Sequence, residues 1–285
     1  MGSSDTENIY SLEGCRTQVG GHTPFIHLDD EHLLKPCSLR EIQFYERMPI
    51  ALKPIVPIVC AVFKNKTPQL TALRCLNCSK TADKFHEIIK KIPPSVINSP
   101  ILKEKQLSQH FLVVDDLTKG MSSMRIIDLK LGKRFYAIDA SEEKIKRKIR
   151  KIQNTTSLIC GIRLSGVLYR ETKRDWKIGK NEGRAMKMEQ LETTLQLFFN
   201  VPLEVREILS SKIEEMIRII RKLNGLRLFG ASLLVTIDVE QLVCRVKLID
   251  FANAAFTNQP EFCGPDIEAI LGLNYILQIL NNTHA

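Results

Sequence analysis

The sequence predicts an α+β protein with two lobes. Short apolar runs bounded by turn residues fill residues 24–117, which is typical of a strand-rich lobe. Residues 118–285 instead combine strand-like runs with long helical patterns. The polar stretch TKGMSS begins at Thr118. We therefore expect the lobes to join near residues 115–119, and we expect residues 1–23 to form a flexible polar tail.

In the first lobe, strands alternate with short helices. A helix over residues 38–48 is predicted from Ser38 as its N-cap, with Glu41 three residues later. A second helix is expected to stop at Pro93 and Pro94, because proline cannot continue a helix. Strands are expected at residues 25–35, 54–63, 68–76 and 110–117, and the second helix at residues 81–92.

The second lobe begins with a strand at residues 125–132 and a basic helix. Two long helices are expected at residues 185–199 and 203–223, the latter ending at Asn224 and Gly225. Further strands are expected at residues 158–170, 227–238 and 242–252, and a closing helix at residues 264–280.

Composition and charge limit the function classes. No apolar run of the 285 residues approaches the ~20 needed to span a bilayer, so we expect no membrane insertion. The N-terminus lacks a secretory pattern, which favours a cytoplasmic or nuclear protein. The net charge of +9 indicates a polyanionic partner, which could be nucleic acid, an acidic membrane surface or a multiply phosphorylated small molecule.

Two short motifs carry little weight. Gly2 and Thr6 fit the loose myristoylation pattern, but such matches often arise by chance, and the sequence does not decide whether Gly2 is lipidated. The eight cysteines are expected to be reduced thiols. Cys75 and Cys78 have zinc-knuckle spacing, but without a second ligand pair we expect them to hold no metal.

The basic helix concentrates its charge on one side. At 100° per residue its isoleucines form an apolar stripe, and four cations share one face about 100° wide. The stripe consists of Ile145, Ile149 and Ile152, and the cationic face of Lys144, Arg147, Lys148 and Lys151. Asp139 or Ser141 can cap its start. Such a face is as often merely solvated as functional, but four like charges repel unless an anion offsets them.

Acidic and basic side chains also interrupt apolar strands. Asp128 and Lys130 are two residues apart, so both emerge on one face of their strand. Asp250 ends another apolar run, a position where acids commonly hold a metal ion. With Lys35 on an early strand and Glu41 on the next helix, this resembles the layout of protein kinases. Their glycine-rich loop and HRD motif are absent, and Ala252 stands where DFG has glycine.

Three ordered motifs make the chain resemble the inositol polyphosphate kinases. The signature PxxxDxKxG matches MRIIDLKLG, in which Met124 replaces proline; ASLL at residues 231–234 matches SSLL; and residues 249–251 match IDF. DASEEK and CGIRLSGV are most similar to the inositol hexakisphosphate kinase branch. The resemblance covers residues 25–281. Asn253 stands where relatives often have histidine, and the segment between Asp238 and Asp250 is short.

The resemblance implies a two-lobed kinase-like fold with antiparallel sheets in both lobes and the ATP site in the cleft between them. Residues 24–117 would bind the nucleotide, and residues 118–285 the inositol phosphate and the metal. For the nucleotide it implies Lys35 on the phosphates, Glu41 orienting it, the backbones of Asp115 and Leu117 on adenine, and Asp128 on ribose. It further implies Asp250 and Ser232 as Mg²⁺ ligands, and Lys130, Lys144, Arg147, Lys148, Lys151 and Lys180 on the acceptor.

The sequence therefore predicts an ATP- and Mg²⁺-dependent kinase with inositol hexakisphosphate as acceptor, Lys130 and Asp250 as catalytic residues, and a monomeric state. One alternative is a multikinase or inositol trisphosphate kinase that acts on free hydroxyls. Another, from a different class, is a non-catalytic polyanion-binding module. Nucleic acid is not expected as a partner, because no aromatic residue lies between Glu142 and Gln153 to stack on bases.

Overall fold

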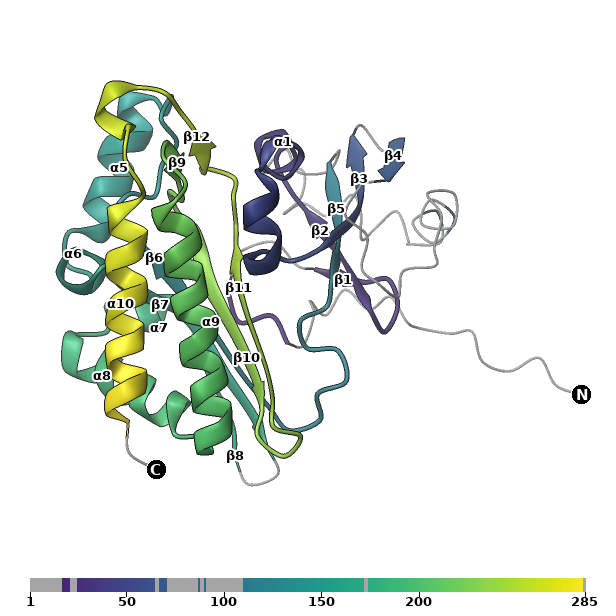
Figure 1. The fold of residues 1–285 in the computed structure, drawn as a ribbon, viewed down its shortest axis with the longest axis vertical. Coiled ribbons are helices and arrows are strands. Elements are labelled where there is room, and N and C mark those ends of the chain that lie inside the picture. Colours follow the sequence, from purple (N-terminus) through teal and green to yellow (C-terminus); the bar gives the residue numbers. More distant parts are fainter. Residues whose placement is uncertain are drawn as a thin grey trace, which may run out of the picture.

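The computed structural model describes residues 17–20, 25–64, 67–70, 87, 90, 110–171 and 174–283. Two five-stranded sheets dominate the described part (Figure 1), and every strand pairing is antiparallel. This confirms the predicted α+β class with antiparallel sheets. The predictions for Gly2, Cys75, Cys78 and most of the helix at residues 81–92 concern residues outside the described ranges.

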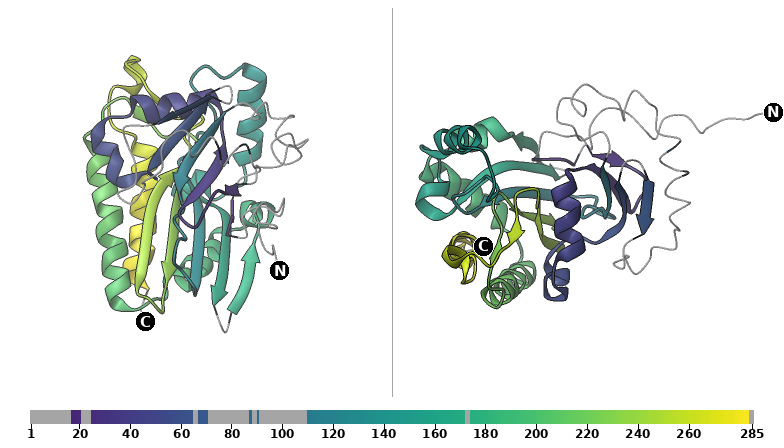
Figure 2. Two further views of the ribbon diagram at one scale, coloured as in Figure 1. Left: turned by 90° about the vertical axis from the view of Figure 1, so that its right-hand side faces the viewer. Right: turned by 90° about the horizontal axis from the view of Figure 1, so that it is seen from above.

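The first sheet has the strand order β1-β2-β5-β3-β4. Its strands are β1 (Ile26–His27), β2 (His32–Pro36), β3 (Val59–Lys64), β4 (Thr67–Leu70) and β5 (Phe111–Asp115). Helix α1 (Leu39–Arg47) lies between the two sheets (Figures 1 and 2). Ser38 caps it as predicted, accepting a hydrogen bond from the Glu41 N–H. A short 3₁₀ helix, η1 (Ile50–Ile55), precedes β3.

The second sheet has the order β11-β10-β6-β7-β8. Its strands are β6 (Met124–Leu131), β7 (Ile162–Glu171), β8 (Arg174–Ile178), β10 (Ser232–Asp238) and β11 (Val243–Ile249). Helices α8 (Met188–Phe199), α9 (Leu203–Arg221) and α10 (Ile267–Asn282) accompany it, with α9 and α10 side by side (Figure 1). Their buried leucines and isoleucines join those of the sheet in one core, which fixes the central strand β6.

Shorter elements complete the second part. Helices α5 (Glu142–Ile152), α6 (Ser157–Cys160) and α7 (Lys180–Ala185) flank the sheet, and β9 (Leu226–Arg227) pairs with β12 (Ala255–Phe256). A further 3₁₀ helix, η2 (Pro260–Phe262), precedes α10. Gly161 ends α6 at φ 75° and touches Gly272 of α10, where a Cβ would lie 2.7 Å from the Gly161 carbonyl oxygen. This contact brings α10 against the start of β7.

Two of the predicted elements were wrong in part. Residues 158–160 form the single helical turn α6 rather than strand, because Gly161 closes that turn in the left-handed conformation. The helix expected at residues 185–199 is divided: Met186 is extended, and the Gln190 side chain accepts from the Lys187 N–H to begin α8 anew. The apolar stripe of α5 is buried at Ile152, whereas Ile149 is 40% exposed.

Residues 17–20 also depart from the predicted flexible tail, since they pack on the second sheet. The Val19 side chain is buried with Met124, Ile126 and Leu168, and the Lys177 ammonium group donates to the Gln18 carbonyl oxygen over 3.0 Å. We call residues 17–20 the N-terminal strap. The N-terminal strap packs against β7 and β8 and precedes the first strand of the first sheet, β1.

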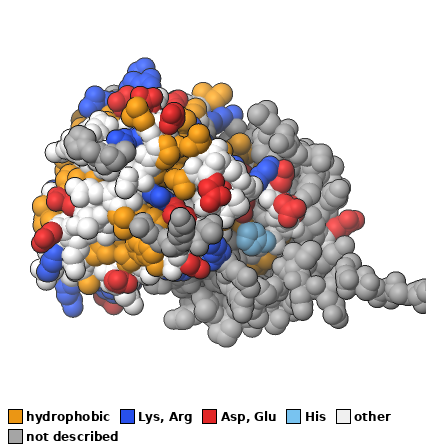
Figure 3. Space-filling model, turned by 90° about the horizontal axis from the view of Figure 1, so that it is seen from below, with side chains coloured by type: hydrophobic (Ala, Val, Ile, Leu, Met, Phe, Trp, Pro, Cys, Tyr) orange, Lys and Arg blue, Asp and Glu red, His pale blue; other side chains and the backbone are white. Residues whose placement is uncertain are grey.

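Positive and negative side chains are mixed on the face of the molecule seen from below (Figure 3). In the view of Figure 3, Lys and Arg side chains are interspersed with acidic and apolar ones. None of the helices in the described ranges has the length and apolar character needed to cross a bilayer.

Candidate active site

A cavity of about 460 Å³ lies between the two sheets. The first sheet contributes Lys35, α1 contributes Glu41, and the second sheet contributes Asp128, Lys130 and Asp250. The strap and the connection after β5 close the remaining sides. The cavity thus gathers residues that are more than 200 positions apart in the sequence, as expected for a cleft between lobes.

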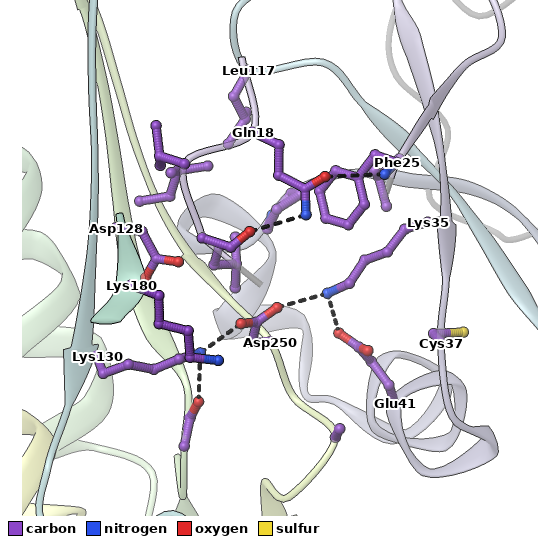
Figure 4. A pocket seen from close by; sticks show the side chains of 18 of the residues that line it. Gln18, Phe25, Lys35, Cys37, Glu41, Leu117, Asp128, Lys130, Lys180 and Asp250 are labelled. Atoms are coloured by element: carbon purple, nitrogen blue, oxygen red, sulfur yellow. Dashed lines mark hydrogen bonds and ion pairs between the residues drawn. The ribbon is translucent and has the colours of Figure 1, made fainter. Parts of the chain in front are cut away.

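Four charged side chains form a chain across this cleft (Figure 4). Lys35 Nζ lies 2.7 Å from Glu41 Oε1 and 3.0 Å from Asp250 Oδ1. Lys130 Nζ lies 2.6 Å from Asp250 Oδ2 and donates to the Gly230 carbonyl oxygen over 3.1 Å. Asp250 is therefore held between one lysine from each sheet, and the structure brings together four residues that the sequence singled out.

The local fold explains this arrangement. Lys35 lies near the end of β2, and the Ser38 cap starts α1 directly afterwards, so that Glu41 falls in its first buried turn. Asp250 follows β11 with φ 68°, a left-handed conformation that aspartate tolerates better than most residues. Burial alone would raise the pKa of Asp250, but Lys130 and Lys35 hold it well below its usual range. Asp250 therefore stays ionised.

Asp128 lies deeper in the same cleft. It is 2% exposed, and its Oδ1 atom has no hydrogen-bond partner among the described residues. Burial raises its pKa, an effect that Lys130 and the nearby hydroxyls of Ser232 and Ser165 partly offset. The strap covers its other oxygen: a Cβ on Gly20 would lie 1.8 Å from Asp128 Oδ2. Only glycine fits there.

The connection between the lobes that is predicted to bind adenine already makes hydrogen bonds within the protein. Asp115 accepts a hydrogen bond from the Ile58 N–H over 2.7 Å, and both residues named for adenine line the cleft. The Leu117 carbonyl oxygen, however, accepts from Thr236 Oγ1 and Arg245 Nη1, each over 2.9 Å. Because a carbonyl has two acceptor sites, Leu117 can offer adenine its N–H group but not its oxygen.

A wall of cations faces Lys130. The cations of this wall are Lys148, Lys151, Arg163, Lys180 and Arg184, and all of them line the cleft. Lys144 and Arg147, predicted to share the acceptor face, lie next to Lys148 but are not among the lining residues. Helix α5 presents the second half of its cationic face to the cleft, and its first half forms a rim outside.

The cations of this wall destabilise one another. Burial, reinforced by Lys130 and the two arginines, lowers the pKa of Lys180 to about 8. Burial and Arg184 likewise lower the pKa of Arg163 to about 10. Burial lowers the pKa of Lys148, with Lys151 as the next cause. Such a cluster of desolvated cations is typical of a site for a multiply charged anion.

Arg163 and Arg184 were missed from the sequence. Arg163 lies on β7 directly opposite Lys130, and its guanidinium lies over the Phe135 ring, 4.7 Å from the ring centroid. Arg184 lies on α7, and its Nε atom is buried with no partner in the described ranges. A charged residue inside the apolar run GIRLSGV was the available signal for Arg163. Nothing in the sequence distinguished Arg184 from a surface arginine.

The residues present fit a divalent cation at Asp250. Carboxylate oxygens are preferred Mg²⁺ ligands, and the Asp250 side chain is 29% exposed to the cleft. No group of three or more metal-ligating side chains occurs in the described ranges, so further ligands have to come from phosphates and water. Ser232 is 0% exposed, does not line the cleft and lies near Asp128. It does not fit the predicted metal role.

This combination of an antiparallel two-sheet fold, a Lys–Glu–Asp group in the cleft and a cationic wall defines a kinase-like site for a polyanionic substrate. A family model for inositol polyphosphate kinases matches residues 111–281, more than half of the chain. The chain therefore belongs to the inositol polyphosphate kinase family.

Individual relatives agree with this assignment. Inositol hexakisphosphate kinase 2 from Oryctolagus cuniculus is 31% identical over 80% of this chain and 75% of its own length. Inositol hexakisphosphate kinase 3 from Homo sapiens is 24% identical over 95% of both chains. An uncharacterized inositol polyphosphate kinase from Schizosaccharomyces pombe is 30% identical, but this chain spans only 20% of it.

A solved structure supports the fold. The inositol phosphate multikinase Ipk2 from S. cerevisiae, crystallised with ADP and Mn²⁺, superposes with a TM-score of 0.62 at 22% identity. The match covers 88% of this chain and 98% of that chain. At this level of identity the likeness establishes the shared kinase-like α+β fold.

Proposed function

We propose that this chain is an ATP- and Mg²⁺-dependent kinase that phosphorylates inositol hexakisphosphate to a diphosphoinositol phosphate. The observation that carries the proposal is the position of Lys130. Its ammonium group meets Asp250 on the side of Lys35 and faces the cationic wall on the other. A group in this position can contact both the transferring phosphoryl group and the acceptor.

On the nucleotide side, Lys35 binds the phosphates of ATP, and Glu41 holds it in place through the 2.7 Å ion pair. The N–H group of Leu117 donates to adenine at the hinge. Asp128 accepts from the ribose hydroxyls, for which its Oδ1 atom still has acceptor capacity. The ADP complex of Ipk2 supports a nucleotide in this cleft.

The metal belongs at Asp250. Bound there, Mg²⁺ neutralises charge on the phosphates of ATP. The Mn²⁺ in the Ipk2 structure supports a divalent cation. Asp250 is suited to this task because Lys130 and Lys35 hold its pKa well below the usual range, which keeps the carboxylate ionised. Lys35 and Lys130 then turn from Asp250 toward phosphate oxygens.

The acceptor lies against the cationic wall. The five cations of the wall, together with Lys130, offset the charge of a highly phosphorylated ring better than that of a lightly phosphorylated one. Arg163 and Arg184 are suited to bidentate phosphate contacts, because guanidinium groups present paired donors. The rim cations Lys144 and Arg147 attract the polyanion without holding it. The names of the mammalian relatives point to the same acceptor.

The chemistry of transfer needs no general base with this acceptor. A phosphate oxygen of inositol hexakisphosphate is already ionised at neutral pH and attacks the γ-phosphorus of ATP. The new phosphoanhydride bond forms while the bond to the bridging oxygen breaks, and ADP leaves with that electron pair. Lys130 stabilises the charge that develops on the transferring group. The carboxylates nearest Lys130 have other roles in this proposal, since Asp250 pairs with Lys35 and Lys130 and Asp128 accepts from the ribose.

An acceptor panel tests the proposal. The protein is incubated with ATP, Mg²⁺ and inositol phosphates carrying three to six phosphates, and the products are separated by anion exchange and assigned by ³¹P NMR. We expect the highest kcat/KM with inositol hexakisphosphate and a diphosphate signal in its product. New phosphate esters only, formed on free hydroxyls, would identify a multikinase. Binding without transfer would identify a polyanion-binding module.

The α5 helix gives a position-specific prediction. Lys148→Ala and Lys151→Ala each remove a charged contact inside the cleft, so the KM for the acceptor should rise about tenfold or more while the KM for ATP is unchanged. Lys146→Ala is the matched control, because Lys146 is exposed and pairs with Glu142. Steady-state kinetics with both substrates measure this. An equal rise in the acceptor KM for all three variants would indicate general electrostatic attraction by the helix rather than specific contacts in the cleft.

Lys180 predicts a pH dependence. Burial, reinforced by Lys130, Arg184 and Arg163, lowers its pKa to about 8, and acceptor phosphates should raise it. Acceptor binding near pH 8 should therefore take up a proton, and affinity should weaken as the pH rises through 8. Without acceptor the sign is opposite: stability rises there, because the unfolded state holds the proton longer.

Calorimetric titration in buffers of different ionisation enthalpy measures the proton uptake. Lys180→Arg keeps the charge at every pH, so it should abolish the part of the uptake that belongs to Lys180 and should bind acceptor with a flatter pH profile. An uptake that is unchanged in Lys180→Arg would assign the proton to another cation of the wall, such as Lys148, and contradict the prediction.

A further inference from the structure

Aromatic rings join helix α1 to the segment that carries Asp250. The Phe44 ring of α1 stacks on Phe251, with centroids 4.3 Å apart and planes 13° apart. It also stacks on Phe256 at 5.5 Å and 14°. Tyr45, the next residue of α1, meets Phe251 edge-on at 5.4 Å. We call Phe44, Phe251 and Phe256 the aromatic stack. It connects the first sheet's helix with the second sheet's metal-binding segment.

The stack borders directly on the charged chain of the cleft. The Phe251 N–H donates to Glu41 Oε1 over 3.2 Å, the same oxygen that pairs with Lys35. Asp250, one residue earlier, is in the left-handed conformation at φ 68°. Such a conformation costs on the order of 1–3 kcal/mol and persists only where the surroundings enforce it. Phe251, 0% exposed between α1 residues, supplies that enforcement.

Phe256 is the outer member of the stack. It lies on β12 opposite Leu226 of β9, so backbone pairing holds it in place independently of its side chain. Its side chain is 39% exposed, whereas Phe44 is 4% and Phe251 0% exposed. A change at Phe256 therefore alters the stack with little loss of core packing. This makes it the position at which positioning can be separated from folding.

We propose that Phe256, through its stacking on Phe44, is a positioning residue that keeps Glu41 and Asp250 aligned on Lys35. The ring limits rotation and sliding of Phe44, and Phe44 in turn fixes Phe251 and the peptide that bonds to Glu41. Weakening the contact between Phe256 and Phe44 therefore loosens the ion pairs of Lys35 with Glu41 and Asp250, although Phe256 does not itself touch Lys35. The consequence for catalysis rests on the proposed kinase function, whereas the consequence for Lys35 itself does not.

The test compares variants that keep or remove the ring. Phe256→Leu retains apolar volume without a ring, and Phe256→Tyr retains the ring. Phe262→Leu is the matched control: Phe262 is also half-buried, but its ring contacts Phe229, Arg134 and Arg227 rather than the stack. Two quantities are measured in each full-length protein: the rate of Lys35 acetylation by acetic anhydride, from peptide mass spectrometry, and steady-state kinetics.

Aromatic stacking is worth enough to change these quantities about three- to tenfold. We expect Lys35 acetylation to accelerate by that factor in Phe256→Leu, kcat to fall by a similar factor, and the acceptor KM to stay within about twofold. Phe256→Tyr and Phe262→Leu should behave as the wild type. Equal Lys35 acetylation in all four proteins would overturn the inference. A wild-type protein that transfers no phosphate would refute the kinase proposal, while the acetylation rates would still decide this one.

Discussion

Asp250→Asn should lower kcat by about a thousandfold or more, because the charge that holds the metal on the phosphates is lost. Acceptor binding should persist, since the cationic wall is unchanged. From the sequence alone Asp250 is an unpaired carboxylate at the end of an apolar run, and its neutralisation would be expected to leave the thermal stability unchanged or slightly higher. The structure reverses that expectation. Lys130 loses its carboxylate partner and Lys35 keeps only Glu41, so Tm should fall.

Three measurements check this result: turnover with saturating ATP and Mg²⁺, acceptor affinity by calorimetry, and thermal unfolding. Asp175→Asn is the control, because Asp175 lies exposed on β8 outside the cleft. It should match the wild type in all three. A folded Asp250→Asn protein with near-normal turnover would be incompatible with the mechanism proposed above.

Lys130→Met should have the second largest effect. Removing one preorganised donor to developing charge lowers kcat about 100- to 1,000-fold. Because Lys130 also contacts the acceptor in our proposal, the acceptor KM should rise about tenfold. The ATP KM should change little, since Lys35, Glu41 and Asp250 all remain on the nucleotide side of the cleft. The loss in kcat/KM for the acceptor should therefore exceed the loss for ATP.

Lys133→Met provides the control for this variant. Lys133 is half-buried two residues beyond the end of β6 and does not line the cleft, so its replacement removes the same charge from the same neighbourhood. Both variants are compared by initial rates over a matrix of ATP and acceptor concentrations. A Lys130→Met protein with an unchanged kcat and a raised acceptor KM would reduce Lys130 to a binding residue.

The fold and the centre of the site could be predicted because both rest on local patterns. Ser38 and Glu41 mark the start of α1, and the apolar runs that carry Lys35, Lys130 and Asp250 fix where these side chains emerge. Strand alternation and capping act over a few residues, so the sequence contains them directly. The same holds for the cationic face of α5, whose members are set by helical periodicity alone.

What the sequence could not supply depends on how elements meet. Periodicity defines the face of α5 but not its tilt, so only packing reveals that Lys148 reaches the cleft and Lys144 does not. The sequence predicts a backbone role for Leu117, but it does not reveal that Thr236 and Arg245 donate hydrogen bonds to the Leu117 carbonyl oxygen. Arg184 reaches the cleft only because α7 packs against β7, a contact that the sequence does not reveal. Each of these depends on contacts between residues far apart in the chain.

The strap makes the nucleotide side of the cleft depend on residues outside the part of the chain that matches the family. Val19 and Gly20 lie outside residues 111–281, the part that matches the family model, yet they cover Asp128. Gly166 permits this approach, since a Cβ there would lie 2.0 Å from the Val19 carbonyl oxygen. A sequence change confined to the strap would therefore alter the nucleotide side of the cleft while leaving residues 111–281 unchanged.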